Sequence, residues 1–165
     1  MNDEVDQVVS GWRVARPDVD VEPLQLLSRV GRLAQILDDR RERAFAVHGL
    51  ATHEFDVLAA LRRRGPDGEL TPGELSEITH VTSGTMTNRL DRLQRRRLIA
   101  RRRHPEDGRQ NLIRLTAAGR RRVDGALTEL LDYERAIVDA LNDRDRAATV
   151  RALRALLAAG SPPDS

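Results

Sequence analysis

Apolar residues recur every three or four positions along most of this 165-residue chain, which is the spacing of one buried helix face. The spacing predicts a short helix from Asp3 to Val14 and a long one from Glu22 to about His48. Pro17 separates these two helices, and Pro23 lies in the first turn of the second. Further helices are expected over residues 52–64, 71–79, 82–97, 116–141 and around 150–157.

The pattern changes after residue 97, where two short strand-like segments follow each other. Residues 98–103 and 111–115 are candidate strands, and residues 104–110 between them are rich in turn-forming types. We expect a β-hairpin here, so the predicted fold class is mainly α with a small β-hairpin wing.

Helix-start signals place two short helices directly before this hairpin. Thr71-Pro72-Gly73-Glu74 is a capping box, and Thr82 or Ser83 can cap the next helix. Thr52 is expected to cap the helix before them, and Thr116 the helix after the hairpin. Two capped helices joined tightly and followed by a hairpin are typical of a winged helix-turn-helix.

This arrangement predicts three regions. Residues 1–49 would form an extra N-terminal helix and the first dimerisation helix, residues 50–115 the winged helix-turn-helix, and residues 116–165 the C-terminal dimerisation helices and tail. The chain is 39% hydrophobic and 33% charged, so its own core is lean. Amphipathic helices that pack against a second copy would compensate for that.

Charge is concentrated in one segment. All 28 basic residues are arginines, and residues 89–122 hold 13 of them against three acidic residues. A focused basic segment suits phosphate binding, although a solvated arginine-rich surface is the alternative explanation.

Other function classes lack support in the sequence. There is no cysteine, and His48, His53, His80 and His104 lie in different segments without the spacing of a metal site. No phosphate-cradling glycine loop, membrane-spanning run or signal peptide is present. We therefore expect a cytoplasmic protein without membrane association, catalytic residues, metal or cofactor.

The second helix of the pair carries short polar side chains near its start. Ser83, Thr85, Thr87 and Asn88 are expected on its exposed face, where they could contact bases or phosphates in a major groove. An ordinary polar helix face is the alternative. The position between a capped helix and an arginine-rich hairpin favours double-stranded DNA as the partner.

The hairpin and the end of that helix add cationic candidates. Arg109 at the hairpin tip could enter a minor groove, with Asp107 orienting its guanidinium. A simple salt bridge within the turn is the alternative. Arg92 and Arg103 are further candidates, and side chains alternate along a strand, so at least one of residues 101–103 should point back toward the protein.

From Leu50 to Gly119 the sequence resembles the MarR family of winged-helix regulators. The resemblance rests on segments in the same order, among them FDVLAAL (55–61), LTPGEL (70–75), VTSGTMT (81–87), DRL (91–93), DGR (107–109) and LTAAG (115–119). It implies an obligate homodimer that binds a pseudo-palindromic operator, usually as a repressor released by a small ligand.

One departure from the family pattern is Arg95-Arg96-Arg97, where the family usually has a glycine before the wing. An arginine in a left-handed conformation there costs about 1 kcal/mol unless the turn is built differently.

A narrower resemblance is to the urate-responsive branch of the family. It implies a ligand site at four positions, namely Trp12, Asp56, Arg89 and Arg101. A urate-like anion needs a planar cover, which Trp12 supplies, and fixed cationic forks, which Arg89 and Arg101 supply. Asp56 would be repelled by the bound anion.

Each of these four residues also has a structural explanation. Trp12 could pin the extra helix, Asp56 and Arg89 could form a static ion pair, and Arg101 could contact phosphate. Relatives in this branch respond to other carboxylates or to phenolic ligands. A DNA-binding protein without a physiological ligand is a further alternative.

Overall fold

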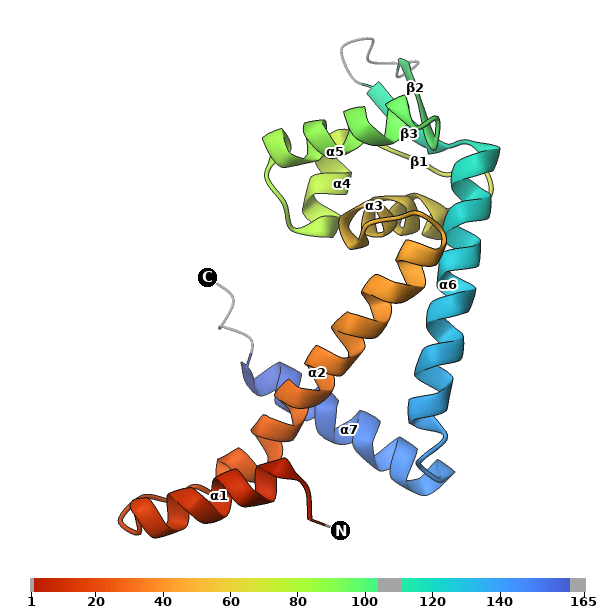
Figure 1. The fold of residues 1–165 in the computed structure, drawn as a ribbon. Helices are drawn as coiled ribbons and strands as arrows, with labels where there is room; N and C mark the ends of the chain where they lie inside the picture. The colour runs from red at the N-terminus through yellow and green to blue at the C-terminus, as the bar shows by residue number, and fades with distance from the viewer. Residues whose placement is uncertain (1, 104–110, 161–165) are drawn as a thin grey trace.

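The computed structural model of the chain describes residues 2–103 and 111–160, and it is mostly helical (Figure 1). The helices of the described residues are α1 (Glu4–Ala15), α2 (Glu22–Val47), α3 (Thr52–Arg63), α4 (Pro72–Thr79), α5 (Ser83–Arg95), α6 (Ala117–Val138) and α7 (Asp143–Gly160). The strands are β1 (Glu69–Leu70), β2 (Ile99–Arg103) and β3 (Asn111–Leu115). The predicted fold class, mainly helical with a small wing, is confirmed.

Helices α3, α4 and α5 gather against the small sheet at one end of the molecule, and the long helices α2 and α6 extend away from it (Figure 1). Helix α1 lies across the far end of α2, and α7 follows α6 at the same far end. None of the helices in residues 2–103 and 111–160 is long and apolar enough to cross a bilayer.

The main core lies within the winged-helix unit, which includes α3, and extends to where α2 and α6 meet it. Phe45 at the end of α2 and Phe55 on α3 stack with ring centroids 3.9 Å apart and an interplanar angle of 11°. Gly125 on α6 allows close packing against α2, because a Cβ at this position would lie 2.6 Å from Cε1 of His48. These contacts join the long helices to the unit that carries the hairpin.

A small separate cluster joins α1 to α2. Val5, Val9 and Val21 are buried together, and Arg29 of α2 binds Asp3, just before α1, and Asp6, within it, at 2.8 and 2.7 Å. Hydrogen bonds from Arg29 hold the pKa of Asp3 below its usual value. Asp3, predicted as the first helical residue, is instead the N-cap of α1.

The sheet has three strands, where the sequence predicted two. The order is β1-β3-β2, all antiparallel, with Leu70 opposite Ile113 and Arg101 opposite Ile113 on the other side. Strand β1 is only two residues long, which is too short to show the alternation of apolar and polar residues that identifies a strand in the sequence. Its pairing with β3 attaches the base of the wing to the helix-turn-helix.

Most of the predicted helix starts are confirmed. Thr71 and Glu74 form the capping box of α4, and the side chains of Thr82 and Thr116 cap α5 and α6. Thr52 was the wrong cap for α3, because the N-cap is Ala51 and its N–H donates to Glu54 Oε2 at 3.1 Å. The long helix predicted to reach residue 141 ends at Val138.

The turn between α5 and the wing contains the unusual arginine. Arg97 has φ = +57°, its N–H donates to Gln94 O, and the Leu98 N–H donates to Leu93 O at 3.0 Å. This is the ordinary left-handed helix ending that glycine favours. The turn is therefore the left-handed type, with an arginine in the position that glycine favours.

Replacing Arg97 with glycine should raise the free energy of unfolding by about 1 kcal/mol, because glycine adopts positive φ without a Cβ clash. Urea unfolding at fixed protein concentration measures the change. Arg97→Ala is the control, since it removes the same charge but keeps the Cβ and should gain little. Equal stabilisation in both variants would assign the effect to charge instead of backbone strain.

Candidate nucleic-acid interface

Helices α4 and α5 form a tight pair joined by a left-handed turn. His80 has φ = +51°, and the Val81 N–H donates to Ser76 O at 3.1 Å, which ends α4 sharply. The Thr82 side chain then accepts from the Thr85 N–H and starts α5. On α5, Met86, Leu90 and Leu93 are buried against the core, so the opposite face of this helix is held outward.

The predicted polar residues at the start of α5 all lie on that outward face. Ser83, Thr85, Thr87 and Asn88 are exposed. The Thr87 hydroxyl donates to Ser83 O at 2.9 Å, and Thr85 Oγ1 lies 3.0 Å from Thr82 Oγ1. Among the described residues nothing hydrogen-bonds the side chains of Ser83 and Asn88. These two side chains are therefore the most available to an external partner.

The arginines of strand β2 alternate as expected. Arg102 lies on the outer face of the sheet, where its Nε donates to Glu69 Oε1 of β1 at 2.7 Å. Arg101 lies on the other face and donates to Asp91 of α5 at 2.5 Å. Arg103, at the end of the strand, is exposed and forms no ion pair within the described residues. Arg103 is thus the most available cation of β2, while Asp107 and Arg109 lie outside the described residues.

Arg92 is not a purely outward-facing residue. Its Nε lies 3.0 Å from Oε1 of Glu54, although the side chain remains 57% exposed. Arg96, one turn later, donates to Oε2 of the same carboxylate. Arg92 therefore pairs with the protein body while it still faces solvent.

Glu54 was missed by the sequence analysis and is the one buried charged residue in the part of the chain that the structure describes. It is 1% exposed. The sequence did contain a signal for the burial of Glu54, because residues 54, 58 and 61 share one helix face and Leu58 and Leu61 are core residues. A carboxylate on such a face requires cationic partners from elsewhere in the fold.

The surroundings of Glu54 keep it ionised. Burial alone raises the pKa of its carboxyl group, but the Arg96 hydrogen bond, the Ala51 N–H and the charges of Arg96 and Arg92 outweigh burial. The resulting pKa is lower than the ordinary value. Glu54 is therefore a carboxylate at neutral pH.

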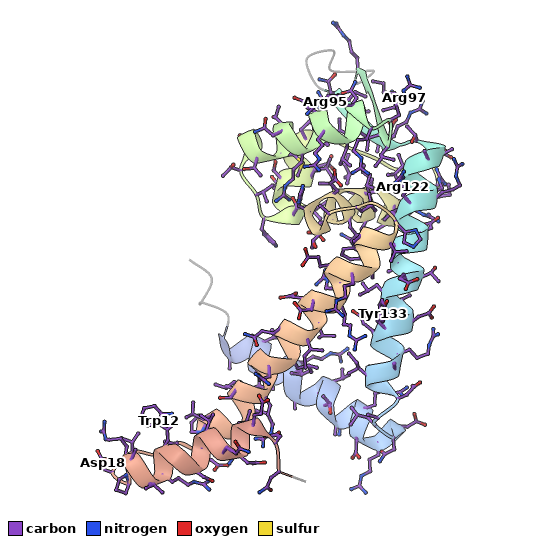
Figure 2. The ribbon with its side chains drawn as sticks, viewed as in Figure 1. Trp12, Asp18, Arg95, Arg97, Arg122 and Tyr133 are labelled. Carbon is purple, nitrogen blue, oxygen red and sulfur yellow. The ribbon has the colours of Figure 1, made fainter. Side chains whose placement is uncertain are left out.

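The four predicted ligand residues do not meet within one chain. Asp56, Arg89 and Arg101 belong to the winged-helix end, whereas Trp12 lies at the opposite end of the molecule from Arg95 and Arg97 (Figure 2). The 26 residues of α2 lie between them, which is about 39 Å of helix.

The structure also bears on the structural explanations considered for these residues, among them a static ion pair between Asp56 and Arg89. Trp12 is half exposed and lines a cavity of about 310 Å³ with Arg16, Val21 and Leu24. Asp56 and Arg89 form no ion pair with each other in the described structure. Residues 2–103 and 111–160 contain no group of His, Asp or Glu side chains suited to a metal ion.

Known proteins match both the sequence and the fold. The sequence model of the MarR family matches residues 48–110. The chain is 32% identical to the HTH-type transcriptional regulator PecS of Dickeya dadantii, over 93% of this chain and 90% of that protein.

Solved structures share the fold. RV1404 from Mycobacterium tuberculosis superposes with a TM-score of 0.72 and 23% identity, over 88% of this chain and 97% of that one. A single-residue mutant of MarR from E. coli, complexed with operator DNA, superposes with a TM-score of 0.62 and 24% identity, covering 84% and 99% of the two chains.

Proposed function

Because the chain belongs to the MarR family of winged-helix transcriptional regulators, we propose that it binds a pseudo-palindromic operator as a homodimer and acts as a repressor released by urate or a related purine anion. The regulators of this family are not enzymes, so no catalytic residue is assigned. The observation that carries the proposal is the outward polar start of α5 beside an arginine-rich wing.

Unpartnered apolar surface supports the homodimer. Helix α7 has no fully buried residue within the described chain, although its 18 residues include Val150, Leu153 and Leu156. Large apolar side chains are also exposed on α2 and α6, namely Leu26, Leu27, Val30, Leu33, Ile36, Leu127, Leu131 and Val138. A second copy packed on these faces would bury them. This supports the proposed division into dimerisation regions at residues 1–49 and 116–165 around the unit at 50–115.

In the proposed complex the start of α5 enters the major groove. Ser83 and Asn88 would contact base edges, Thr85 and Thr87 bases or phosphates, and Arg103 the DNA backbone. Arg92 would contact a phosphate with the guanidinium nitrogens that do not face Glu54. Asp107 and Arg109 keep the roles proposed from the sequence, at the wing tip in the minor groove.

Asn88→Ala should lower operator affinity by about 5- to 150-fold and leave affinity for unrelated DNA nearly unchanged, because a base contact is worth about 1–3 kcal/mol. Fluorescence anisotropy with operator and scrambled duplexes measures both affinities. Arg103→Ala is the contrasting variant: it should weaken both duplexes and reduce the log–log salt slope by about 0.9. An unchanged ratio of operator to scrambled affinity in Asn88→Ala would remove that residue from base recognition.

The ligand site proposed for urate requires residues from two copies. Trp12 of one chain would cover an anion held by Arg89 and Arg101 of the other, with Asp56 beside it. The distance between Trp12 and the other three residues within one chain supports a site shared across the dimer. Similarity to PecS over 93% of the chain is consistent with this arrangement.

The ion pair between Arg101 and Asp91 suggests how such a ligand would act. Asp91 lies on α5, and Arg101 on β2 binds it at 2.5 Å. An anion that bound Arg101 would compete with Asp91, while Asp56 would be repelled by it. Arg89 on the same helix would shift toward the ligand, and α5 would rotate away from its half-site.

Urate should quench the fluorescence of Trp12, the only tryptophan, and release operator DNA over the same concentration range. Arg89→Ala should lose both responses and still bind DNA, although more weakly. A response to phenolic or other carboxylate ligands but not to purines would favour the alternative effector class. No response to any of them would favour a ligand-independent DNA-binding protein.

A further inference from the structure

We propose that Glu54 is a positioning residue that holds the C-terminal half of α5 against the corner between α2 and α3, and thereby sets operator affinity without touching DNA. The proposal rests on the operator binding proposed above and adds the element that orients the recognition helix. Glu54 is buried beneath α5, where it contacts Arg92 and Arg96, and it also accepts the Ala51 N–H at the start of α3. Its route to the DNA-binding helix is through the two arginines.

The contacts of Arg96 define the attachment. One guanidinium nitrogen donates to Glu54 Oε2, and Nη2 donates to the carbonyl oxygen of Gly49 at 2.5 Å. Gly49 lies between α2 and α3, so the single side chain of Arg96, the C-cap of α5, binds the end of one helix and the start of the next. Arg92 adds its charge at 3.0 Å from Oε1, an oxygen that receives no hydrogen bond from the described residues.

Arg122 also binds the corner between α2 and α3, which comprises residues 48–51. Arg122 of α6 donates from Nη1 to His48 O at 2.7 Å. Gly49 has φ = +64°, and a Cβ there would lie 2.7 Å from Nη1 of Arg122. The chain therefore turns from α2 into α3 in a space bounded by two guanidinium groups, with little room for independent movement.

This attachment gives α2 a direct route to the recognition helix. The corner lies at the end of α2, and the rest of this helix exposes apolar side chains, among them Leu33 and Ile36, that a second copy would cover. A change in the tilt of α2 would move Gly49 and with it Arg96 and α5. Glu54 is the group that keeps Arg96 in place, because the buried carboxylate and its cations stabilise each other only while they are paired.

The change in net charge and the loss of the α5 attachment predict opposite effects of Glu54→Gln on operator affinity. Measuring that affinity therefore distinguishes the two. Removing a carboxylate adds one positive charge to the protein, and this alone strengthens binding to DNA. A loosened α5 instead weakens binding to the operator specifically. We expect Glu54→Gln to lose about tenfold in operator affinity, whereas its affinity for scrambled DNA should be unchanged or slightly higher because of the added positive charge.

Glu74→Gln is the matched control. It makes the same chemical change in the same unit, and Glu74 stabilises the start of α4 through Thr71 without contacting α5. Glu74→Gln should keep operator affinity within about threefold of the wild type at a temperature where circular dichroism shows all proteins folded. Equal losses in the two variants, or wild-type affinity in folded Glu54→Gln, would overturn the proposal.

Arg96→Gln removes the same attachment from the side of α5, so the proposal remains testable where Glu54→Gln does not fold. It should reduce operator affinity by a similar factor and leave the salt slope unchanged. A fall of about 0.9 in that slope would instead identify Arg96 as a phosphate contact and contradict the proposal. Failure of the wild type to bind any operator would count against the proposed function, whereas normal binding by both variants would count against Glu54 alone.

Discussion

Replacing Leu153 with aspartate should convert the homodimer into monomers and lower operator affinity by about 100-fold or more. Leu153 lies on α7, none of whose side chains is fully buried in the described chain, and it remains 36% exposed. In the proposed dimer an aspartate here would be buried without a partner. A monomer contacts one half-site only. It therefore loses the roughly 10²–10⁴-fold increase in affinity that binding two linked half-sites provides.

Sedimentation equilibrium and anisotropy with one-site and two-site duplexes measure these two effects. Ile78→Asp is the control, because Ile78 is comparably exposed but lies on α4, away from α6 and α7. This control should remain a dimer although it receives the same charge. A dimeric Leu153→Asp with normal operator affinity would exclude α7 from the interface.

Phe45→Ala should lower the free energy of unfolding by about 3–5 kcal/mol, the usual cost of deleting a buried aromatic ring. Phe45 is fully buried and stacks on Phe55 at 3.9 Å, so its loss leaves a cavity where α2 meets α3. The same cavity lies beside the corner that Arg96 binds. We therefore expect weaker operator binding as well, even at temperatures where the variant is folded.

Urea unfolding at fixed protomer concentration tests the stability change, since a dimer's apparent stability depends on concentration. Val47→Ala provides the control two residues away in the same helix, because Val47 is exposed and should change stability by less than about 0.5 kcal/mol. A loss below about 1 kcal/mol in Phe45→Ala would show that the core adjusts around the missing ring.

The helices could be predicted because their signals are local. The capping box at Thr71 and Glu74 and the apolar spacing of α5 involve residues within a few positions of one another. The outward position of Ser83 and Asn88 follows from the same spacing, since Met86 and Leu90 define the buried face. The strained arginine before the wing was also visible as a departure from the family, and Arg97 occupies it.

Features that join distant segments could not be predicted in the same way. Strand β1 is two residues long and exists through pairing with β3, which lies more than 40 positions later. Glu54 interrupts an apolar face, but its partners Arg92 and Arg96 belong to another helix. Trp12 was grouped with Asp56, Arg89 and Arg101 by resemblance, yet α2 separates it from them in a single chain.

The sequence by itself thus determined the helical segments, the hairpin and the polar start of α5, because propensity, capping and periodicity act over a few residues. Only the tertiary structure decided which arginine and which carboxylate form each ion pair. It paired Arg101 with Asp91, Arg102 with Glu69, and Arg96 with Glu54. In a chain with 28 arginines and 26 acidic residues, the sequence allows many pairings, and the fold selects among them by bringing helices and strands together.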